Sequence, residues 1–101
     1  MLNNLIKRRI ILGIKQKDIA IFLGYSISSY SNIENGNRYI NNDTLNILAY
    51  ILDMDTLSIL GIIPYYRKLD DISKYYIKLK YKLDDTKISN LYKKDVYDIR
   101  K

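Results

Sequence analysis

The chain has 101 residues, of which 48% are hydrophobic, and a formal net charge of +6, so it is long enough for one domain with its own core and suits an anionic partner. It contains no Cys and no His, which excludes disulfides and thiolate metal sites and removes the commonest general base and zinc ligand. No hydrophobic run approaches the ~18 residues needed to span a bilayer, and Lys7, Arg8 and Arg9 interrupt the first one, so we expect a cytoplasmic protein with no signal peptide and no membrane contact.

Periodic hydrophobic positions predict five helices and no strand in residues 1–64. The predicted helices cover residues 2–12, 16–23, 27–35, 56–60 and, for the fourth, from 43 or 44 to 52. Ser26 and Asp55 are suitable N-caps for the third and fifth helices, and either Asn42 or Asp43 is expected to cap the fourth. Pro64 follows the last helix and marks the expected end of this domain.

The second and third predicted helices are separated by a very short turn. Ile19 and Ala20 fall on one face of the second helix, and Tyr30 and Ile33 on one face of the third. Gly24 lies where a sharp turn needs a residue that tolerates positive φ. The small side chain of Ala20 lets two helices cross closely. These features are typical of a helix-turn-helix, whose second helix enters the DNA major groove.

Residues 65–101 form a C-terminal extension whose pattern leaves two readings open. A seam with spacings of 3, 4, 3 and 4 residues predicts a helix that packs on another helix; its members are Leu69, Ile72, Tyr76, Leu79 and Leu83. Residues 77–83 also alternate as a half-buried strand would. We favour the helix because it fits the longer window. A final amphipathic helix is expected after Asp84, with Ile88, Leu91, Tyr92, Val96 and Ile99 on its apolar side.

The extension carries most of the positive charge. Residues 1–64 contain six basic and five acidic residues, a net of +1, whereas residues 65–101 contain eleven and six, a net of +5. The basic run 74–82 is either a solvated helix face or an additional DNA-binding arm. The apolar seam either folds back on the core or pairs across a two-fold axis, and we favour pairing.

The order of motifs from about Asn4 to Leu60 resembles the phage repressor and Cro-like family of helix-turn-helix regulators. The matching segments are NLIKRRIILG at 4–13, Gln16, LGYS at 23–26, IENG at 33–36 and TLNILAYILDMDTLSIL at 44–60. The resemblance implies an all-α fold: a five-helix repressor-like DNA-binding domain, here followed by the extension that we expect to be helical. Tyr25 and Tyr30 depart from the aliphatic residues usual in the family.

The resemblance also implies which residues contact DNA. By position, Ile27, Ser28 and Asn32 match base-reading residues; Asn can pair with adenine, and Ile can meet a thymine methyl. The alternative for these is a solvated helix face or, for Ile27, partial burial. The residues expected to bind phosphate are Gln16, Lys15, Lys17, Asn35, Asn37 and Arg38. Arg9 and Glu34 match an internal ion pair of the family.

These features predict a sequence-specific regulator of double-stranded DNA. We expect a repressor of mobile-element or antitoxin type that binds a two-fold operator as a homodimer, with half-sites about one helical turn apart. The alternative is a protein-interaction scaffold whose extension binds a protein partner such as a toxin. No nucleophile–base pair suggests an enzyme. Asp70–Asp71 and Asp84–Asp85 are expected to be helix caps, so no metal or cofactor is expected.

Overall fold

The computed structural model describes residues 1–92, and within that span the chain forms seven helices and no strand. The helices are α1 (Asn3–Ile11), α2 (Gln16–Leu23), α3 (Ile27–Glu34), α4 (Asn42–Leu52), α5 (Thr56–Ile59), α6 (Asp71–Tyr81) and α7 (Asp85–Ser89). The five helices predicted for the N-terminal part are confirmed, and so is the helical alternative for the extension. The last predicted helix was too long: α7 ends at Ser89, so Leu91 and Tyr92 follow it in a turn, and Val96 and Ile99 lie outside the described residues.

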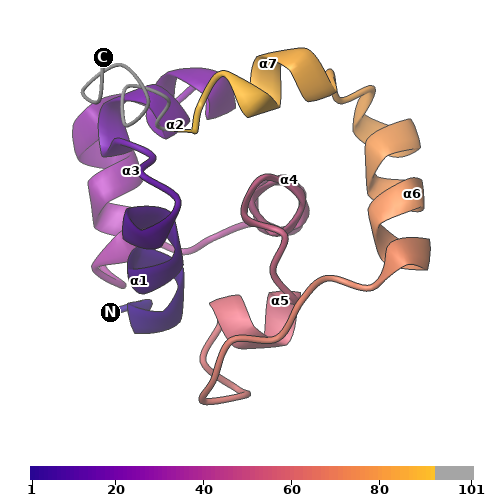
Figure 1. Cartoon of the computed structure of the whole chain (residues 1–101). Helices are drawn as coiled ribbons and strands as arrows, with labels where there is room; N and C mark the ends of the chain where they lie inside the picture. Colours follow the sequence, from indigo (N-terminus) through magenta and orange to yellow (C-terminus); the bar gives the residue numbers. More distant parts are fainter. Residues whose placement is uncertain (93–101) are drawn as a thin grey trace, which may run out of the picture.

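Helix α4 lies at the centre of the molecule, and the other helices surround it (Figure 1). Helices α1 to α3 lie on one side of it and α6 on the other, with α5 and α7 closing the two remaining sides. This position explains why α4 has more buried residues than any other described helix: its side chains at Leu48, Ala49, Ile51 and Leu52 are fully buried. Residues from the N-terminal part and from the extension join one continuous core.

Side-chain caps set most of the helix starts. Ser26, Asp55, Asp70 and Asp84 each accept a hydrogen bond from a backbone N–H in the first turn of the helix that follows. The cap predicted for α4 was wrong by one or two residues, because Asn41 accepts from the Thr44 N–H at 2.8 Å and Asn42 already belongs to the helix. All three polar residues can serve as caps, so composition alone could not select one.

The segment after α5 is bound back onto the N-terminal part rather than leaving it at Pro64. The Ser58 hydroxyl donates to the Tyr65 carbonyl oxygen at 2.8 Å and accepts from the Arg67 N–H at 3.0 Å. The Arg67 guanidinium also pairs with Asp55 at 3.1 Å. These bonds direct the chain so that Leu69 enters the core, where it is 4% exposed.

Helices α6 and α7 are held against the rest of the molecule by one apolar face and by several polar contacts. Ile77 of α6 and Ile88 of α7 are buried in the common core. Lys74 Nζ lies 2.9 Å from Asp53 Oδ1, and Lys78 Nζ lies 2.6 Å from Asp85 Oδ2. Further bonds link tyrosine hydroxyls to distant acceptors: Tyr50 to Asp85, Tyr81 to Asp43 and Tyr92 to the carbonyl oxygen of Ile51.

The predicted seam does not form one surface. Leu69 precedes α6 and is buried. Leu83 is half-buried and lies beyond the end of α6, because the C-cap Lys82 has the left-handed conformation. The three members inside α6 are instead exposed: Ile72, Tyr76 and Leu79. The predicted seam continues the spacing of 3 and 4 residues past both ends of α6, where this spacing no longer places side chains on one face. Ile77, outside the seam, packs on the core instead.

Candidate nucleic-acid interface

Helices α2 and α3 are joined by a turn that fixes their crossing. Gly24 has φ +80°, in the left-handed region that glycine adopts without strain. The Tyr25 N–H returns to the Ala20 carbonyl oxygen at 2.9 Å, and Ala20 itself is fully buried. A larger side chain at this crossing would push the two helices apart, so the turn and the alanine together set the direction of α3.

Helix α3 is buried on one face and open on the other. Tyr30 and Ile33 are at most 1% exposed, whereas Ile27, Ser28 and Asn32 lie on the outer face and are exposed. Ile27 is 49% exposed, so half of its side chain remains available for contact. The three residues expected to read bases therefore share one accessible surface of a firmly packed helix.

A buried carboxylate connects the first three helices. Arg9 Nε of α1 donates to Glu34 Oε2 of α3 at 2.6 Å, and Arg9 Nη2 reaches Glu34 Oε1 at 3.1 Å. Arg9 and Glu34 thus form the ion pair that the family resemblance implies. Gln16 Nε2 of α2 donates to the same Glu34 Oε1 at 2.8 Å. Because Glu34 is 1% exposed, its charge depends on these donors for solvation.

The start of α2 offers backbone donors for a phosphate. Lys15 occupies the N-cap position in extended conformation, and no side chain caps this end. The first N–H groups of α2 can therefore bind an anion, and the helix dipole favours one there. Lys15 and Lys17 are exposed beside this end, and Gln16 is half-buried. Through its bond to Glu34, Gln16 ties the end of α2 to α3.

The segment after α3 presents three more of the expected residues. Asn35 closes the helix, and Gly36 follows with φ +80°. The N–H groups of Asn37 and Arg38 both donate to the Asn32 carbonyl oxygen, at 2.9 and 3.1 Å. This turn leaves the side chains of Asn35, Asn37 and Arg38 exposed next to α3.

Tyr25 positions the Arg38 side chain, a role that sequence reasoning missed. The Arg38 guanidinium carbon lies 5.1 Å from the centre of the Tyr25 ring, within the range of a cation–π contact. The Tyr25 hydroxyl bonds to Thr44 Oγ1 of α4 at 2.8 Å. The sequence did offer one sign of this role: position 25 has an aromatic residue where the family usually has an aliphatic one.

Tyr30, the other departure from the family pattern, lies beneath α3. Its side chain is fully buried, and its hydroxyl has no hydrogen-bond partner among residues 1–92. Burial raises the pKa of the Tyr30 hydroxyl far above its ordinary value, and the nearby Glu34 carboxylate raises it further. The ring therefore stays neutral and acts as part of the core.

A family model described as helix-turn-helix matches residues 5–57, which is more than half of the chain. The chain belongs to the phage-repressor and Cro-like helix-turn-helix family. It is therefore a DNA-binding transcriptional regulator. The surface around α3 is the one on which the residues expected to contact DNA are exposed. No curated protein and no solved structure matches the chain.

Other features of this regulator lie away from that surface. Helix α6 lies across α4 from α3 (Figure 1), and Lys74 and Lys78 are already in ion pairs. These positions favour the solvated-face interpretation of the basic run 74–82. None of the described helices is long and apolar enough to cross a membrane, and residues 1–92 contain no acidic cluster of three or more that could hold a metal ion.

Proposed function

We propose that this protein is a sequence-specific repressor that acts in the cytoplasm as a dimer on a two-fold operator, of the kind found with mobile elements and antitoxins. The observation that carries the proposal is the outer face of α3, where Ile27, Ser28 and Asn32 are exposed beside one another. Base-reading contacts from these three residues supply specificity.

Contacts to the phosphate backbone place α3 in register. Two groups of residues flank the recognition helix for this purpose. Lys15, Gln16 and Lys17 lie at the open end of α2, and Asn35, Asn37 and Arg38 follow α3. Because the net charge of residues 1–64 is only +1, binding depends on the placement of these groups more than on a general positive field.

The test is a selection of bound fragments from the native genome, followed by fluorescence titration on the selected duplex and on a random duplex of equal length. A specific regulator binds its own site at least about a thousandfold more tightly at physiological salt. Equal affinity for both duplexes would contradict specific recognition.

The second candidate is a protein-interaction scaffold. The observation that favours it is the exposed hydrophobic face of α6, which lies on the far side of the molecule from α3. In that case the random and selected duplexes would bind equally weakly, and the activity would reside in the extension.

A further inference from the structure

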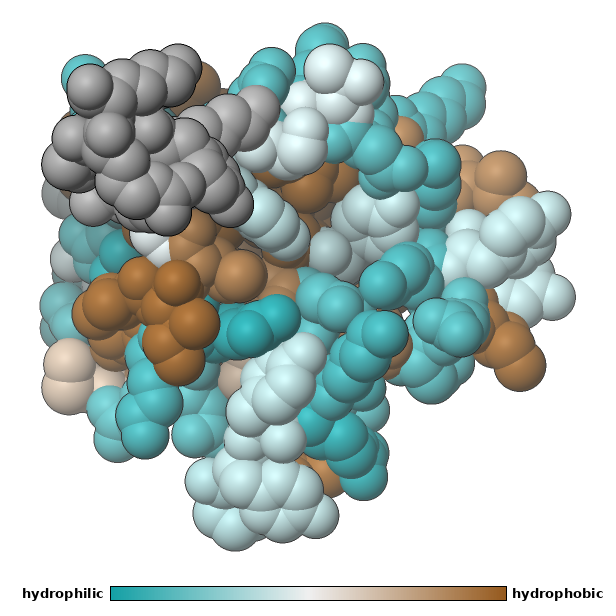
Figure 2. Space-filling model, viewed as in Figure 1, coloured by the Kyte–Doolittle hydropathy of each residue, from teal (hydrophilic) through white to brown (hydrophobic). Residues whose placement is uncertain are grey.

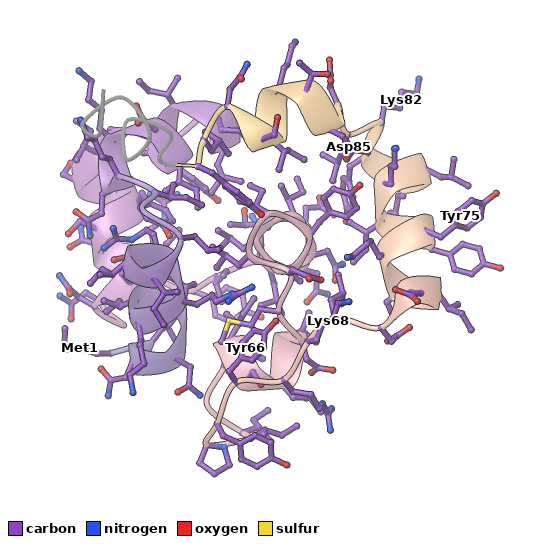
Figure 3. The ribbon with its side chains drawn as sticks, viewed as in Figure 1. Met1, Tyr66, Lys68, Tyr75, Lys82 and Asp85 are labelled. Atoms are coloured by element: carbon purple, nitrogen blue, oxygen red, sulfur yellow. The ribbon has the colours of Figure 1, made fainter. Side chains whose placement is uncertain are left out.

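Helix α6 has an outer face of large hydrophobic side chains that nothing in the described chain covers. Ile72, Tyr75, Tyr76 and Leu79 are 71%, 61%, 65% and 56% exposed. Figure 2 shows hydrophobic side chains at the edge of the molecule formed by α6, and Figure 3 shows Tyr75 pointing away from the body. Their spacing of 3, 1 and 3 residues places all four on one side of the helix.

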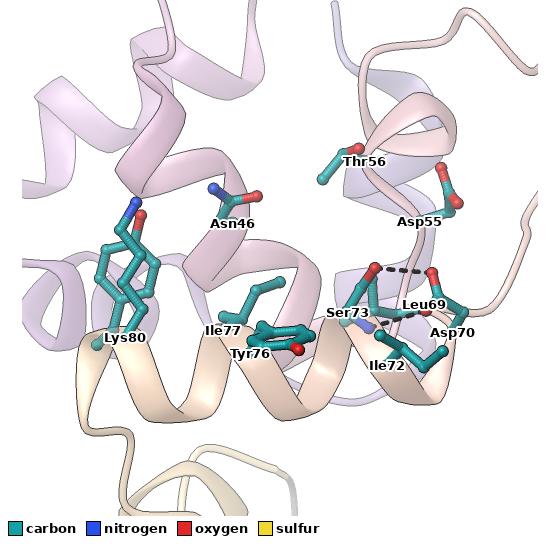
Figure 4. A pocket seen from close by; sticks show the side chains of 11 residues that line it. Asn46, Asp55, Thr56, Leu69, Asp70, Ile72, Ser73, Tyr76, Ile77 and Lys80 are labelled. Carbon is teal, nitrogen blue, oxygen red and sulfur yellow. Dashed lines mark hydrogen bonds between the residues drawn. The ribbon is translucent and has the colours of Figure 1, made fainter.

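The exposed face of α6 is not flat. A groove of about 340 Å³ runs between α6 on one side and α4 and α5 on the other, and Ile72 and Tyr76 line its outer edge (Figure 4). The rings of Tyr75 and Tyr76 meet edge to face, with centroids 5.7 Å apart. A paired aromatic ridge beside a groove is a shape that a second such surface can pack against.

The face is self-complementary in an antiparallel arrangement. Around a two-fold axis that passes between Tyr75 and Tyr76, each Ile72 faces Leu79 of the second copy. The two copies of Tyr75 meet on one side of the axis and the two copies of Tyr76 on the other. A two-fold interface requires this kind of match, because the same patch must fit itself. The number of residues from Ile72 to the axis equals the number from the axis to Leu79.

The two ends of α6 carry opposite charges. Asp71 is exposed at the start of α6, and Lys82 is exposed at its end. Asp71 is the first residue of α6, and Lys82 directly follows the last, so the two charges lie at opposite ends of the helix. Antiparallel packing brings Asp71 of one copy near Lys82 of the other, whereas parallel packing would set Asp71 against Asp71. Opposite charges at the rim favour the antiparallel pairing.

We propose that the occupant of this face is a second copy of the same chain, packed antiparallel through Ile72, Tyr75, Tyr76 and Leu79. The inference rests on the proposed function in one respect, because it supplies the dimer that the repressor requires. Leu69 and Leu83 take no part, since both pack on the core. Four side chains per copy make a small interface, so the dimer is expected to be weak without DNA.

Sedimentation of the full chain at up to about 100 μM, far above the range of a tight dimer, tests the pairing. The wild type is expected to shift from monomer toward dimer as its concentration rises, and Leu79→Glu to remain a monomer. Ile10→Glu is the matched control, because Ile10 is 63% exposed on α1. A wild type that stays monomeric, or a control that loses the dimer as Leu79→Glu does, overturns the proposal.

The register is tested by cross-linking, which is clean here because the sequence contains no Cys. Tyr76→Cys, close to the axis, is expected to form a disulfide with its own copy under mild oxidation. Ile72→Cys alone is not, but a mixture of Ile72→Cys and Leu79→Cys chains is, because a disulfide needs Cα atoms about 4.4–6.8 Å apart. A disulfide of Ile72→Cys with itself, and none in the mixture, overturns the antiparallel register.

A charge exchange provides a second check on the same contact. Asp71→Lys and Lys82→Asp are each expected to weaken the dimer, and the double variant to recover it, because residues eleven positions apart cannot meet within one helix. Absence of recovery counts against the contact. Binding of a single half-site duplex is measured on the same proteins, so that the two proposals can be tested separately. If the chain never dimerises but still binds the half-site, only the α6 interface is refuted. If the chain dimerises but binds no DNA, only the proposed function is refuted.

Discussion

The guanidinium of Arg38 lies over the ring of Tyr25, with 5.1 Å from its carbon to the ring centre. Tyr25 belongs to the turn before α3, and Arg38 to the turn after it. The segments that precede and follow α3 therefore meet through these two side chains. An arginine held in this way loses less conformational freedom when it binds a phosphate, so we expect it to contribute to affinity.

Replacement of Arg38 should weaken binding to all DNA. Arg38→Ala removes one cation next to α3, and the salt dependence of binding should fall by about one unit of slope. Titrations at several salt concentrations, on random and on operator duplexes, measure this slope. If the slope is unchanged, Arg38 is not a phosphate-binding residue.

Replacement of Asn32 should affect specificity instead. Asn32→Ala removes an exposed amide from the outer face of α3, and operator binding should weaken by about 1–3 kcal/mol with little change on random DNA. Competition between the two duplexes measures the difference. An equal loss on both would show that Asn32 does not read bases.

Two tyrosine-to-phenylalanine variants should differ in stability. Tyr25→Phe leaves the buried Thr44 hydroxyl without its partner, so the free energy of unfolding should fall by about 1–3 kcal/mol. Tyr30→Phe removes a buried hydroxyl that has no partner among the described residues, so stability should be unchanged or slightly higher. Urea denaturation of both variants measures the contrast, and a large loss in Tyr30→Phe would reveal a bond that its hydroxyl makes.

Two neighbouring positions of α6 should also differ. Ile77→Ala opens a cavity against α4, and the free energy of unfolding should fall by about 2–5 kcal/mol. Leu79→Ala lies on the exposed face and should cost less than about 0.5 kcal/mol at protein concentrations where the chain is a monomer. Denaturation at low concentration compares them. Similar losses would mean that α6 does not dock through Ile77.

The proposed α6 dimer changes the expected operator. Helix α4 lies between α3 and α6 (Figure 1), and packed helices have axes about 8–10 Å apart. With the helices of the two copies in line, five such spacings separate the two copies of α3, a distance on the order of 45 Å. This exceeds the roughly 34 Å of one helical turn. We therefore expect half-sites separated by more than one turn, two turns being the next spacing on the same side of the duplex.

Inverted half-sites with increasing spacers provide the measurement. The tightest binding should occur beyond one turn in the wild type, and the dependence on spacing should disappear in Leu79→Glu. An optimum at one turn would point to a dimer through another surface.

The helices of residues 1–64 could be predicted because the helical spacing of hydrophobic residues, the capping residues and the glycines indicate the same boundaries. Where several signals compete, the sequence does not decide: Asn41, Asn42 and Asp43 can all cap α4, and the path of the preceding loop selects Asn41. The exposure of the residues on α2 and α3 that are expected to contact DNA was also predictable, because a helix fixes which residues share a face.

The extension was harder to predict because a period of 3 and 4 residues does not mark where a helix stops. Lys82 ends α6 in the left-handed conformation. Lysine rarely adopts this conformation, so the sequence did not indicate that the helix ends there. Long-range contacts that the family resemblance does not imply were equally inaccessible. The Tyr25–Arg38 contact and the bond from Gln16 to Glu34 depend on how separate turns meet in space, and local pattern carries no information about that.

Because α4 is central, the stability of the N-terminal part and the stability of the extension depend on each other. Helices α1, α5 and α6 all contact it, so neither residues 1–64 nor the extension keeps a complete core without the other. We therefore expect the chain to melt in one all-or-none transition. A protease that removed the extension would then silence the regulator as well as shorten it, and its active level would follow the lifetime of the intact chain.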